Sequence, residues 1–444
     1  MKKLLLALAM LMLLTVSAFA EKEWAVEKYT LKNGLTLLTL EDASTPALSF
    51  QVWYHVGSKN ERPGITGISH LFEHMMFKGS KNFADKEHDR LIQSSGGMLN
   101  AYTSNDMTVY HEEFGTEMLE TVAKLEADRM QYLTITDTQL ASERQVVLEE
   151  RNERIDNSPF GDVLEQLMGN LFLAHSYGWM TIGWRKDVET LTLDDCLNYY
   201  NTYYNPANAT IVVVGDMKTA DTQKLIEKYF GKIPGNPKVP RPIYNEPEQK
   251  GERRIAYHKV SQLPLFIAGY HCPAAGHSDS YALDVLSAIL SGGESSRAYQ
   301  RMVYKDQIAI AAGGQYQSME QAGVFFAFSM MQPGKTTEDG EKALYEEIER
   351  LKTEPVTAEE LQKAKNQIEA QFYMGNQSND DKAGQLGYFA AVMGDYKLLF
   401  QQADKYNAVT ADDVMRVAKT YLGDRNRTVV NVIQENKGAA PMGL

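Results

Sequence analysis

Apolar and polar residues in the first third of the chain recur with the periods of strands and helices. Strand-like patterns cover residues 28–40, 48–56 and 98–114. Helical spacing covers residues 67–77, 86–94 and 116–131. The first strand-like segment holds Asn33-Gly34 between two apolar runs, which predicts a tight β-hairpin. Strands and helices are interspersed, so we expect an α+β fold in which a mainly antiparallel sheet has helices packed on one face.

One stretch of this pattern occurs twice. Residues 192–214 recur as residues 410–432 without a gap, and both copies begin with Thr and have Asp two and three residues later. Each copy predicts a capped helix, a turn and a strand. The repeat is too long for a solenoid unit, so it indicates two domains with the same fold.

The duplication fits the length of the chain, which exceeds what one hydrophobic core supports. We predict an N-terminal domain over residues 21–232 and a homologous C-terminal domain over residues 251–444. Pro and Gly are dense in residues 231–242, which interrupts regular structure. Residues 233–250 are therefore expected to link the two domains.

The first 20 residues have the features of a secretory signal peptide. Two Lys precede the apolar residues 4–16, and Ala18-Phe19-Ala20 forms a small-x-small cleavage site. No later stretch has the length that a membrane span requires, and no Cys at the cleavage point supports a lipid anchor. The periplasm is the expected location, with secretion from the cell as the alternative.

Charge and cysteine content narrow the classes of partner. The chain has 58 acidic and 45 basic residues, a net charge of −13, so nucleic acid and anionic lipid are not expected partners. Cys196 and Cys272 are the only cysteines. We expect two small buried side chains, although an oxidising compartment would allow the two to pair.

His70, Glu73 and His74 form an H-x-x-E-H pattern inside the predicted helix 67–77. Residues four apart share a helix face, so both imidazoles can bind one metal ion with Glu73 beside them. The pattern is typical of zinc hydrolases, in which the Glu takes a proton from zinc-bound water. The competing interpretation is a core helix with buried, hydrogen-bonded His, because the neighbouring residues are apolar and pack with or without zinc.

Catalytic zinc with two His ligands and a water usually takes one more protein ligand, commonly Glu or Asp. Glu143 and Glu150 lie seven residues apart, two helical turns, and would share a helix face. From the pattern alone, this segment is an ordinary charged helix with a solvated face.

Taken together, these motifs strongly resemble the pitrilysin family of zinc peptidases. The residues that carry the resemblance are H-x-x-E-H, Asn100-Ala101-Tyr102-Thr103, and Glu143-Arg144 leading to Glu150. The resemblance spans the mature chain and includes the duplicated two-domain organisation. Within the family, the chain resembles the half-size members, such as the subunits of mitochondrial processing peptidase. It implies two homologous domains, of which only the first carries the zinc motif.

The resemblance also implies roles for single residues. His70, His74 and Glu150 would bind Zn²⁺, with Glu149 the residue most easily confused with the third ligand. Glu73 would be the general base. Glu143 would be a catalytic-site carboxylate that steadies a His ligand.

Family members hold peptide as an added β-strand on an exposed sheet edge. The resemblance places Asn100, Ala101 and Tyr102 on that edge, where backbone pairing would tolerate many substrate sequences. An ordinary edge strand is the alternative for these residues. Phe77 would line a side-chain pocket, with a core aromatic as the alternative.

The chain departs from the family at a second pair of residues. Self-sufficient members carry an Arg and, seven residues later, a Tyr that help to stabilise the tetrahedral oxyanion. An ungapped placement puts Tyr304 and Ala311 at these positions. Arg297 or Arg301 would have to substitute, although each is expected to be structural or on the surface.

The missing pair suggests how the chain assembles. In the family, half-size chains pair, and one subunit can hold zinc while a homologous subunit without the zinc motif supplies Arg and Tyr. This chain resembles the zinc-bearing subunit of such a heterodimer, with a homodimer as the alternative. Gly313-Gly314 resembles a glycine-rich loop at the subunit interface, although ordinary turns use such pairs as well.

The functional hypothesis is a periplasmic zinc endopeptidase that acts on peptides or unfolded segments. The alternative from another class is a non-catalytic zinc-binding or structural subunit of a processing-peptidase-like complex. Such subunits usually have a broken zinc motif, whereas all the motif residues are present here. A zinc hydrolase for non-peptide bonds has only the metal motif in its favour.

Overall fold

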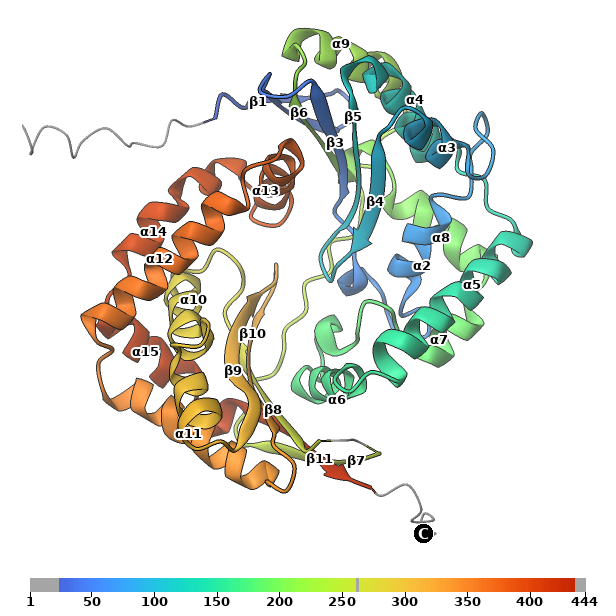
Figure 1. The fold of residues 1–444 in the computed structure, drawn as a ribbon. Coiled ribbons are helices and arrows are strands. Elements are labelled where there is room, and N and C mark those ends of the chain that lie inside the picture. Colours follow the sequence, from blue (N-terminus) through green and yellow to red (C-terminus); the bar gives the residue numbers. More distant parts are fainter. Residues whose placement is uncertain (1–23, 261–262, 436–444) are drawn as a thin grey trace, which may run out of the picture.

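The computed structural model describes residues 24–260 and 263–435. The predicted signal peptide, residues 1–20, lies outside the described residues. Within the described ranges, no helix combines the length and apolarity needed to cross a bilayer. The chain forms two halves, each built around one sheet (Figure 1).

The sheet of the first half has six strands in the order β1-β2-β6-β3-β5-β4. Their bounds are β1 (Glu27–Thr30), β2 (Thr36–Glu41), β3 (Ala47–Tyr54), β4 (Met98–Thr103), β5 (Thr108–Gly115) and β6 (Ala209–Gly215). All neighbours pair antiparallel except β2 and β6. The hairpin predicted around Asn33-Gly34 is confirmed as β1 and β2.

Residues 98–114 form two strands, so the single strand predicted from their alternation is wrong. A turn over residues 104–107 separates β4 from β5. The Ser104 hydroxyl accepts hydrogen bonds from the backbone N–H groups of Asp106 and Met107, at 3.2 Å each, and this closes the turn. The apolar alternation continues on both sides of the turn, which hides the break.

The described part of the first half has eight α-helices, and all of them except α6 contribute to the main hydrophobic core on one face of this sheet. Their bounds are α2 (Ile68–Met75), α3 (Glu87–Ser94), α4 (Leu119–Tyr132), α5 (Asp137–Arg151), α6 (Gly161–Leu171), α7 (Arg185–Thr190), α8 (Leu193–Tyr203) and α9 (Thr219–Phe230). Of these, α6 leaves the first half, as described below. A π-helix, Asn152–Asp156, extends α5.

The second half repeats the plan with five strands in the order β7-β11-β8-β10-β9. The strands are β7 (Arg253–Lys259), β8 (Leu265–Cys272), β9 (Ala309–Ser318), β10 (Gly323–Met331) and β11 (Arg427–Gln434). The helices are α10 (Ser278–Ser291), α11 (Thr337–Thr353), α12 (Ala358–Met374), α13 (Asn379–Ala391), α14 (Gln402–Ala408) and α15 (Ala411–Tyr421). Its single parallel pair, β7 and β11, corresponds to β2 and β6.

The internal repeat seen in the sequence is confirmed in the fold. Thr192 caps α8, which leads into β6, and Thr410 caps α15, which leads into β11. Both caps are reciprocal Thr–Asp capping boxes. Between α9 and β7 the chain has no helix or strand, in keeping with a linker, whereas the predicted boundaries at residues 232 and 251 stay predictions.

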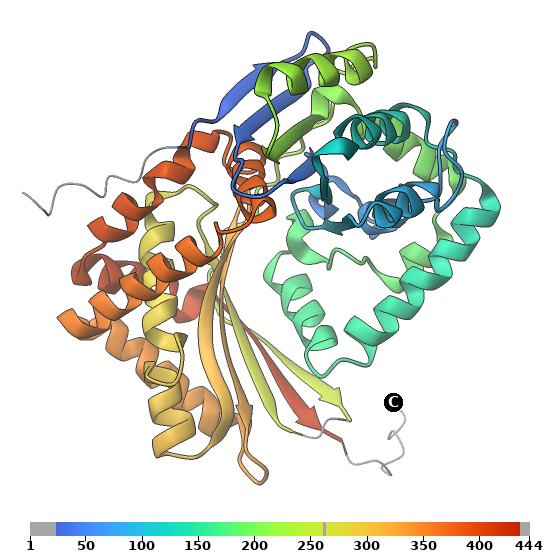
Figure 2. The same ribbon diagram turned by 45° about the horizontal axis from the view of Figure 1, so that its top comes forward.

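The two halves exchange one helix each. Helix α6 packs on β8 and β11 of the second half, and α13 packs on β3 and β6 of the first (Figures 1 and 2). Glycine allows the close contact of α13, because a Cβ on Gly387 would lie 2.1 Å from the Trp53 ring. The expectation of helices on one face therefore holds only within each half. The second face of each sheet is covered from the other half.

Both cysteines are buried and free, as expected from their small number. Cys196 belongs to the core of the first half and Cys272 to that of the second. Since they lie in different cores, a disulfide between them would require the fold to come apart.

Candidate metal centre and peptide site

Helix α2 presents two different faces. Ile68, Leu71, Phe72 and Met75 are fully buried in the first core. The side chain of Glu61 holds the start of the helix by accepting N–H groups of Gly67 and Ser69, at 2.9 and 2.8 Å. The apolar face thus fixes α2 in the core, and the opposite face turns His70, Glu73 and His74 into a pocket.

Helix α5 brings Glu150 to the two imidazoles. Its Oε2 atom lies 3.6 Å from Nε2 of His70 and 3.5 Å from Nε2 of His74. One ligand atom from each residue lies within 4.8 Å of the other two, so His70, His74 and Glu150 could hold one metal ion. Glu149 points away, since its side chain is exposed and accepts a hydrogen bond from Asn152. Of the two carboxylates, Glu150 is thus the one that lies beside both imidazoles.

The chemistry of this donor set suits zinc. Two imidazole nitrogens and one carboxylate oxygen, with room for a water, match a catalytic zinc site. Burial, together with the nearby His74 and Arg154, lowers the pKa of His70 to about 3, so its imidazole is neutral and can donate a lone pair. Nδ1 of His70 has no hydrogen-bond partner within the described residues, which argues against the alternative of a hydrogen-bonded core His.

Glu143 contacts the ring nitrogen of His74 that does not face Glu150. Its Oε2 lies 3.5 Å from Nδ1 of His74, and its Oε1 lies 2.6 Å from Nζ of Lys78. With a proton on Nδ1, the lone pair of His74 is on Nε2. That lone pair faces the point beside Glu150 where a metal ion would lie. Lys78 had no predicted role, although it follows the H-x-x-E-H motif by one helical turn.

Glu73 faces the same pocket from α2. The hydroxyl of Thr103, the last residue of β4, donates to Oε2 of Glu73 at 2.5 Å. Burial raises the pKa of Glu73, and the hydrogen bond from Thr103 opposes that rise. No short motif indicates this contact, because Thr103 follows Glu73 by 30 residues.

The pocket has a volume of about 610 Å³. Asn100, Ala101, Tyr102 and Thr103 of β4 line it, together with Arg154 and Ile155 from the π-helix after α5 and residues 180–182. Strand β4 ends the sheet, and within the described ranges it pairs only with β5. Its outer backbone edge therefore has the geometry to accept another strand.

Phe77 does not line this pocket. Its ring lies 5.9 Å from that of Tyr110 and 5.3 Å from the guanidinium of Arg129. The structure agrees with the alternative of an aromatic packed against the core.

His88, Glu112 and Glu126 form a second group with a ligand-like arrangement. Arg129 already lies among them, with Nη2 bonded to Glu126 and 3.2 Å from Glu112. The guanidinium supplies the positive charge that a metal would bring, so this group is a buried ion-pair cluster.

The residues considered for the oxyanion lie in the second half. Tyr304 is exposed, and Ala311 lies in β9. Arg297 makes two bonds to Glu360, at 2.7 and 2.9 Å, and Arg301 pairs with Glu346 and Glu347. Both Arg are thus engaged in ion pairs within their own half, as expected for structural residues.

Gly313 and Gly314 lie inside strand β9, so their interpretation as an interface loop is wrong. A Cβ on Gly314 would lie 2.7 Å from the Phe325 ring, and one on Gly313 would lie 2.6 Å from the Ser291 hydroxyl oxygen. The Cβ on Gly314 would also lie 2.9 Å from the side chain of Leu290 in α10. These glycines therefore allow α10 to pack closely on β9.

Comparison with known proteins assigns this chain to a family. Residues 36–181 match the family model described as Insulinase (Peptidase family M16), and residues 190–368 match the Peptidase M16 inactive domain. His70, Glu73, His74 and Glu150 all fall within the first match. The second match covers most of the half that lacks the H-x-x-E-H motif.

Curated relatives span almost the whole chain. Zinc protease PqqE of Helicobacter pylori is 33% identical over 96% of this chain and 98% of its own. The mitochondrial-processing peptidase subunit beta of Blastocladiella emersonii is 26% identical over 90% of this chain and 87% of its own.

Solved structures show the same fold. The crystal structure of a protease from Helicobacter pylori has a TM-score of 0.89, with 32% identity over 92% of this chain and 99% of its own. The periplasmic protease PqqL from Escherichia coli has a TM-score of 0.76 at 18% identity, over 95% of this chain and 49% of its own. From the two family models and the relatives that match along its length, this chain belongs to the M16 family of peptidases, which includes insulinase.

Proposed function

We propose that the protein is a zinc-dependent endopeptidase whose zinc ligands are His70, His74 and Glu150. The observation that carries the proposal is the convergence of these side chains on one point beside Glu73, in a pocket whose wall is a free sheet edge. When bound there, zinc would acidify a water molecule and polarise the scissile carbonyl.

The protein's own residues supply the remaining chemistry. Glu73 takes the proton of the attacking water and passes it to the departing amine. Thr103 holds the Glu73 carboxylate by its hydrogen bond, and Glu143 fixes the tautomer of His74. A peptide pairs with the outer edge of β4 at Asn100, Ala101 and Tyr102, and this places its backbone along the pocket.

Substrate class and location follow from the same features. Recognition through backbone pairing suits peptides and unfolded segments, since a folded protein rarely offers a free extended strand. Residues 1–20 support export to the periplasm. The distant structural relative PqqL is described as a periplasmic protease, which fits that proposal.

We also propose that the active form is a dimer with a homologous subunit that lacks the zinc motif, with a homodimer as the alternative. Arg297 and Arg301, the two second-half residues considered as oxyanion donors, are held in ion pairs within the described part of the chain. A relative, the processing peptidase subunit beta, is named as one subunit of an enzyme.

The test of catalysis is Glu73→Gln in the zinc-loaded chain. Zinc content and folding are expected to be unchanged, while hydrolysis of unfolded peptides falls at least about a hundredfold, because an amide cannot accept the water's proton. Glu149→Gln is the matched control, since this exposed carboxylate lies on α5 outside the pocket. Unchanged turnover in metal-loaded Glu73→Gln would reject Glu73 as the base.

A further inference from the structure

The turns of two equivalent hairpins meet where the halves join. Strand β4 ends the first sheet and β9 ends the second, and each pairs with the next strand through a short turn. Residues 104–107 form the first turn and residues 319–322 the second. Here the backbone N–H of Glu320 donates to Oδ2 of Asp106 at 2.9 Å.

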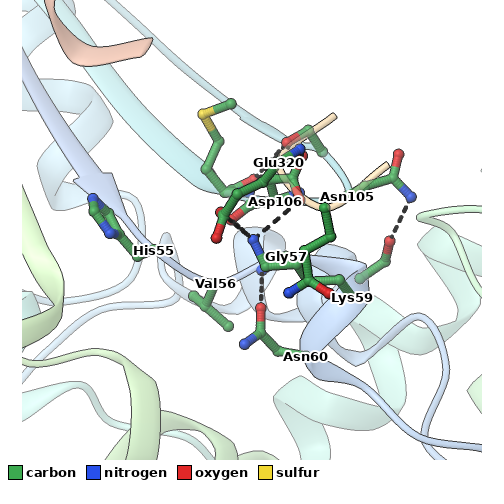
Figure 3. A network of polar contacts seen from close by, with 12 residues as sticks. His55, Val56, Gly57, Lys59, Asn60, Asn105, Asp106 and Glu320 are labelled. Carbon is green, nitrogen blue, oxygen red and sulfur yellow. Dashed lines mark hydrogen bonds and ion pairs between the residues drawn. The ribbon is translucent and has the colours of Figure 1, made fainter. Parts of the chain in front are cut away.

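A buried lysine joins the two turns. Lys59 is 4% exposed, and its Nζ lies 3.0 Å from Oδ1 of Asp106 and in contact with the carboxylate of Glu320 (Figure 3). The Tyr177 hydroxyl donates to the same Oδ1 at 2.6 Å. Burying an ammonium group is costly unless it is paired, so this contact ties the two turns together.

The backbone of the first turn is held as well. The N–H groups of Ser58 and Lys59 donate to the carbonyls of Ser104 and Asn105, at 3.1 and 2.9 Å. Gly57 makes this approach possible, because a Cβ there would lie 2.4 Å from the Ser104 carbonyl oxygen. The turn is therefore clamped by residues 57–59 and by the hairpin of the second half.

This clamp lies next to the candidate catalytic residues. The turn begins directly after Thr103, whose hydroxyl holds Glu73, and Asp106 follows three residues later. A continuous chain of contacts thus runs from Glu320 through Lys59 and Asp106 to the end of β4 and on to Glu73.

We propose that Glu320, from the half without the zinc motif, is a positioning residue for the peptide-binding strand β4. Its carboxylate holds Lys59 against Asp106 and so fixes the turn that sets the free edge of β4 relative to Glu73. The consequence for peptide cleavage rests on the proposed function, whereas the effect on β4 does not.

The experiment compares Glu320→Gln with the wild-type full mature chain. Hydrogen exchange is measured by mass spectrometry on fragments that cover residues 98–115 and, separately, the strands of the second half. Loss of one charge-assisted contact is expected to speed exchange in residues 98–115 about tenfold, with global unfolding by urea nearly unchanged. Glu354→Gln is the control, an exposed carboxylate paired with Arg350 on the surface of the second half.

Function is read in the same variants. In the zinc-loaded protein, the Glu320→Gln substitution is expected to raise KM more than it lowers kcat, with zinc content unchanged. Glu320→Asp keeps the carboxylate and is expected to have a KM between those of Glu320→Gln and the wild type. Peptide affinity is also compared between Glu73→Gln and the double variant Glu73→Gln/Glu320→Gln, which is expected to bind an uncleaved peptide more weakly. This comparison can be made even if the wild type hydrolyses nothing. Exchange in residues 98–115 equal to that of wild type, or faster exchange spread evenly over both sheets, would overturn the proposal.

Discussion

Nδ1 of His74 lies 3.5 Å from Oε2 of Glu143, while Nε2 of the same ring faces Glu150. A carboxylate in this position holds the ring in one orientation and makes it a stronger ligand. We predict that Glu143→Gln lowers zinc affinity about 10–100-fold without removing the site, because outer partners of metal ligands have effects of this size. Competition with a chelator of known affinity measures the change, and an affinity equal to that of wild type would exclude this role.

Substitution of the proposed zinc ligands is expected to abolish zinc binding. The mature chain is expected to bind about one zinc, and His70→Ala, His74→Ala and Glu150→Ala each to lose it, since two remaining ligands bind too weakly. Glu149→Ala provides the matched control and keeps the metal. Metal analysis after gel filtration decides the assignment, which fails if Glu150→Ala retains full zinc.

Assembly is tested through activity. We predict that the chain alone cleaves peptides weakly and that a homologous partner carrying the Arg and Tyr raises turnover by roughly 10²–10³, the value of one oxyanion donor. The assay compares the lone chain, the pair, and a pair whose partner has both residues replaced by Ala. Full activity of the lone chain as a homodimer, unchanged by the partner, would contradict the prediction.

The exchanged helix α13 offers a test with an internal control. Gly387→Ala places a Cβ against the Trp53 ring and is expected to lower the free energy of unfolding by about 1–3 kcal/mol, the usual cost of overpacking. Gly384 lies on the same helix with no atom within 4 Å of an added Cβ. Gly384→Ala is therefore expected to raise stability by about 0.4–1 kcal/mol. Urea unfolding curves measure both, and equal effects would show that the α13 contact is not tight.

The ion pair of Arg297 and Glu360 predicts a dependence of stability on pH. The hydrogen bonds from Arg297 lower the pKa of Glu360 from 4.5 to about 2. Because the pKa of Glu360 is lower in the folded than in the unfolded protein, the ionised carboxylate stabilises the fold at pH values above the unfolded pKa of 4.5. This stabilisation is lost as the pH falls through about 2. Glu360→Gln should therefore be less stable than wild type at neutral pH, with the difference shrinking below pH 4.5.

Denaturant curves at successive pH values test this expectation. The neighbouring exposed residue provides the control, since Glu359→Gln should leave stability nearly constant across the same range. A difference between Glu360→Gln and wild type that persists unchanged in strong acid would contradict a structural role for this pair.

Local patterns predicted much of this molecule. The H-x-x-E-H spacing, the capping boxes at Thr192 and Thr410, and the Asn33-Gly34 hairpin act over a few residues, so the sequence shows them directly. The β4–β5 turn escaped notice because Ser104 closes it by side-chain hydrogen bonds that leave the apolar alternation intact.

Long-range contacts could not be predicted in this way. Thr103 reaches Glu73, and Glu320 reaches Lys59 across 261 residues, through tertiary folding that no short motif encodes. Phe77 packs beside Arg129 for the same reason, since its surroundings are set by α4 and β5 and not by its neighbours in sequence.

The exchange of α6 and α13 makes the two halves mechanically inseparable. A hinge between them would have to lift Leu167 off β8 and Trp53 off α13, and each step would expose apolar surface to water. The chain therefore does not open along its own seam to admit a peptide. Among the described residues, the outer edge of β4 is already unpaired within one chain. In the dimer proposed above, the rate of substrate entry would therefore depend on how firmly the two chains hold each other.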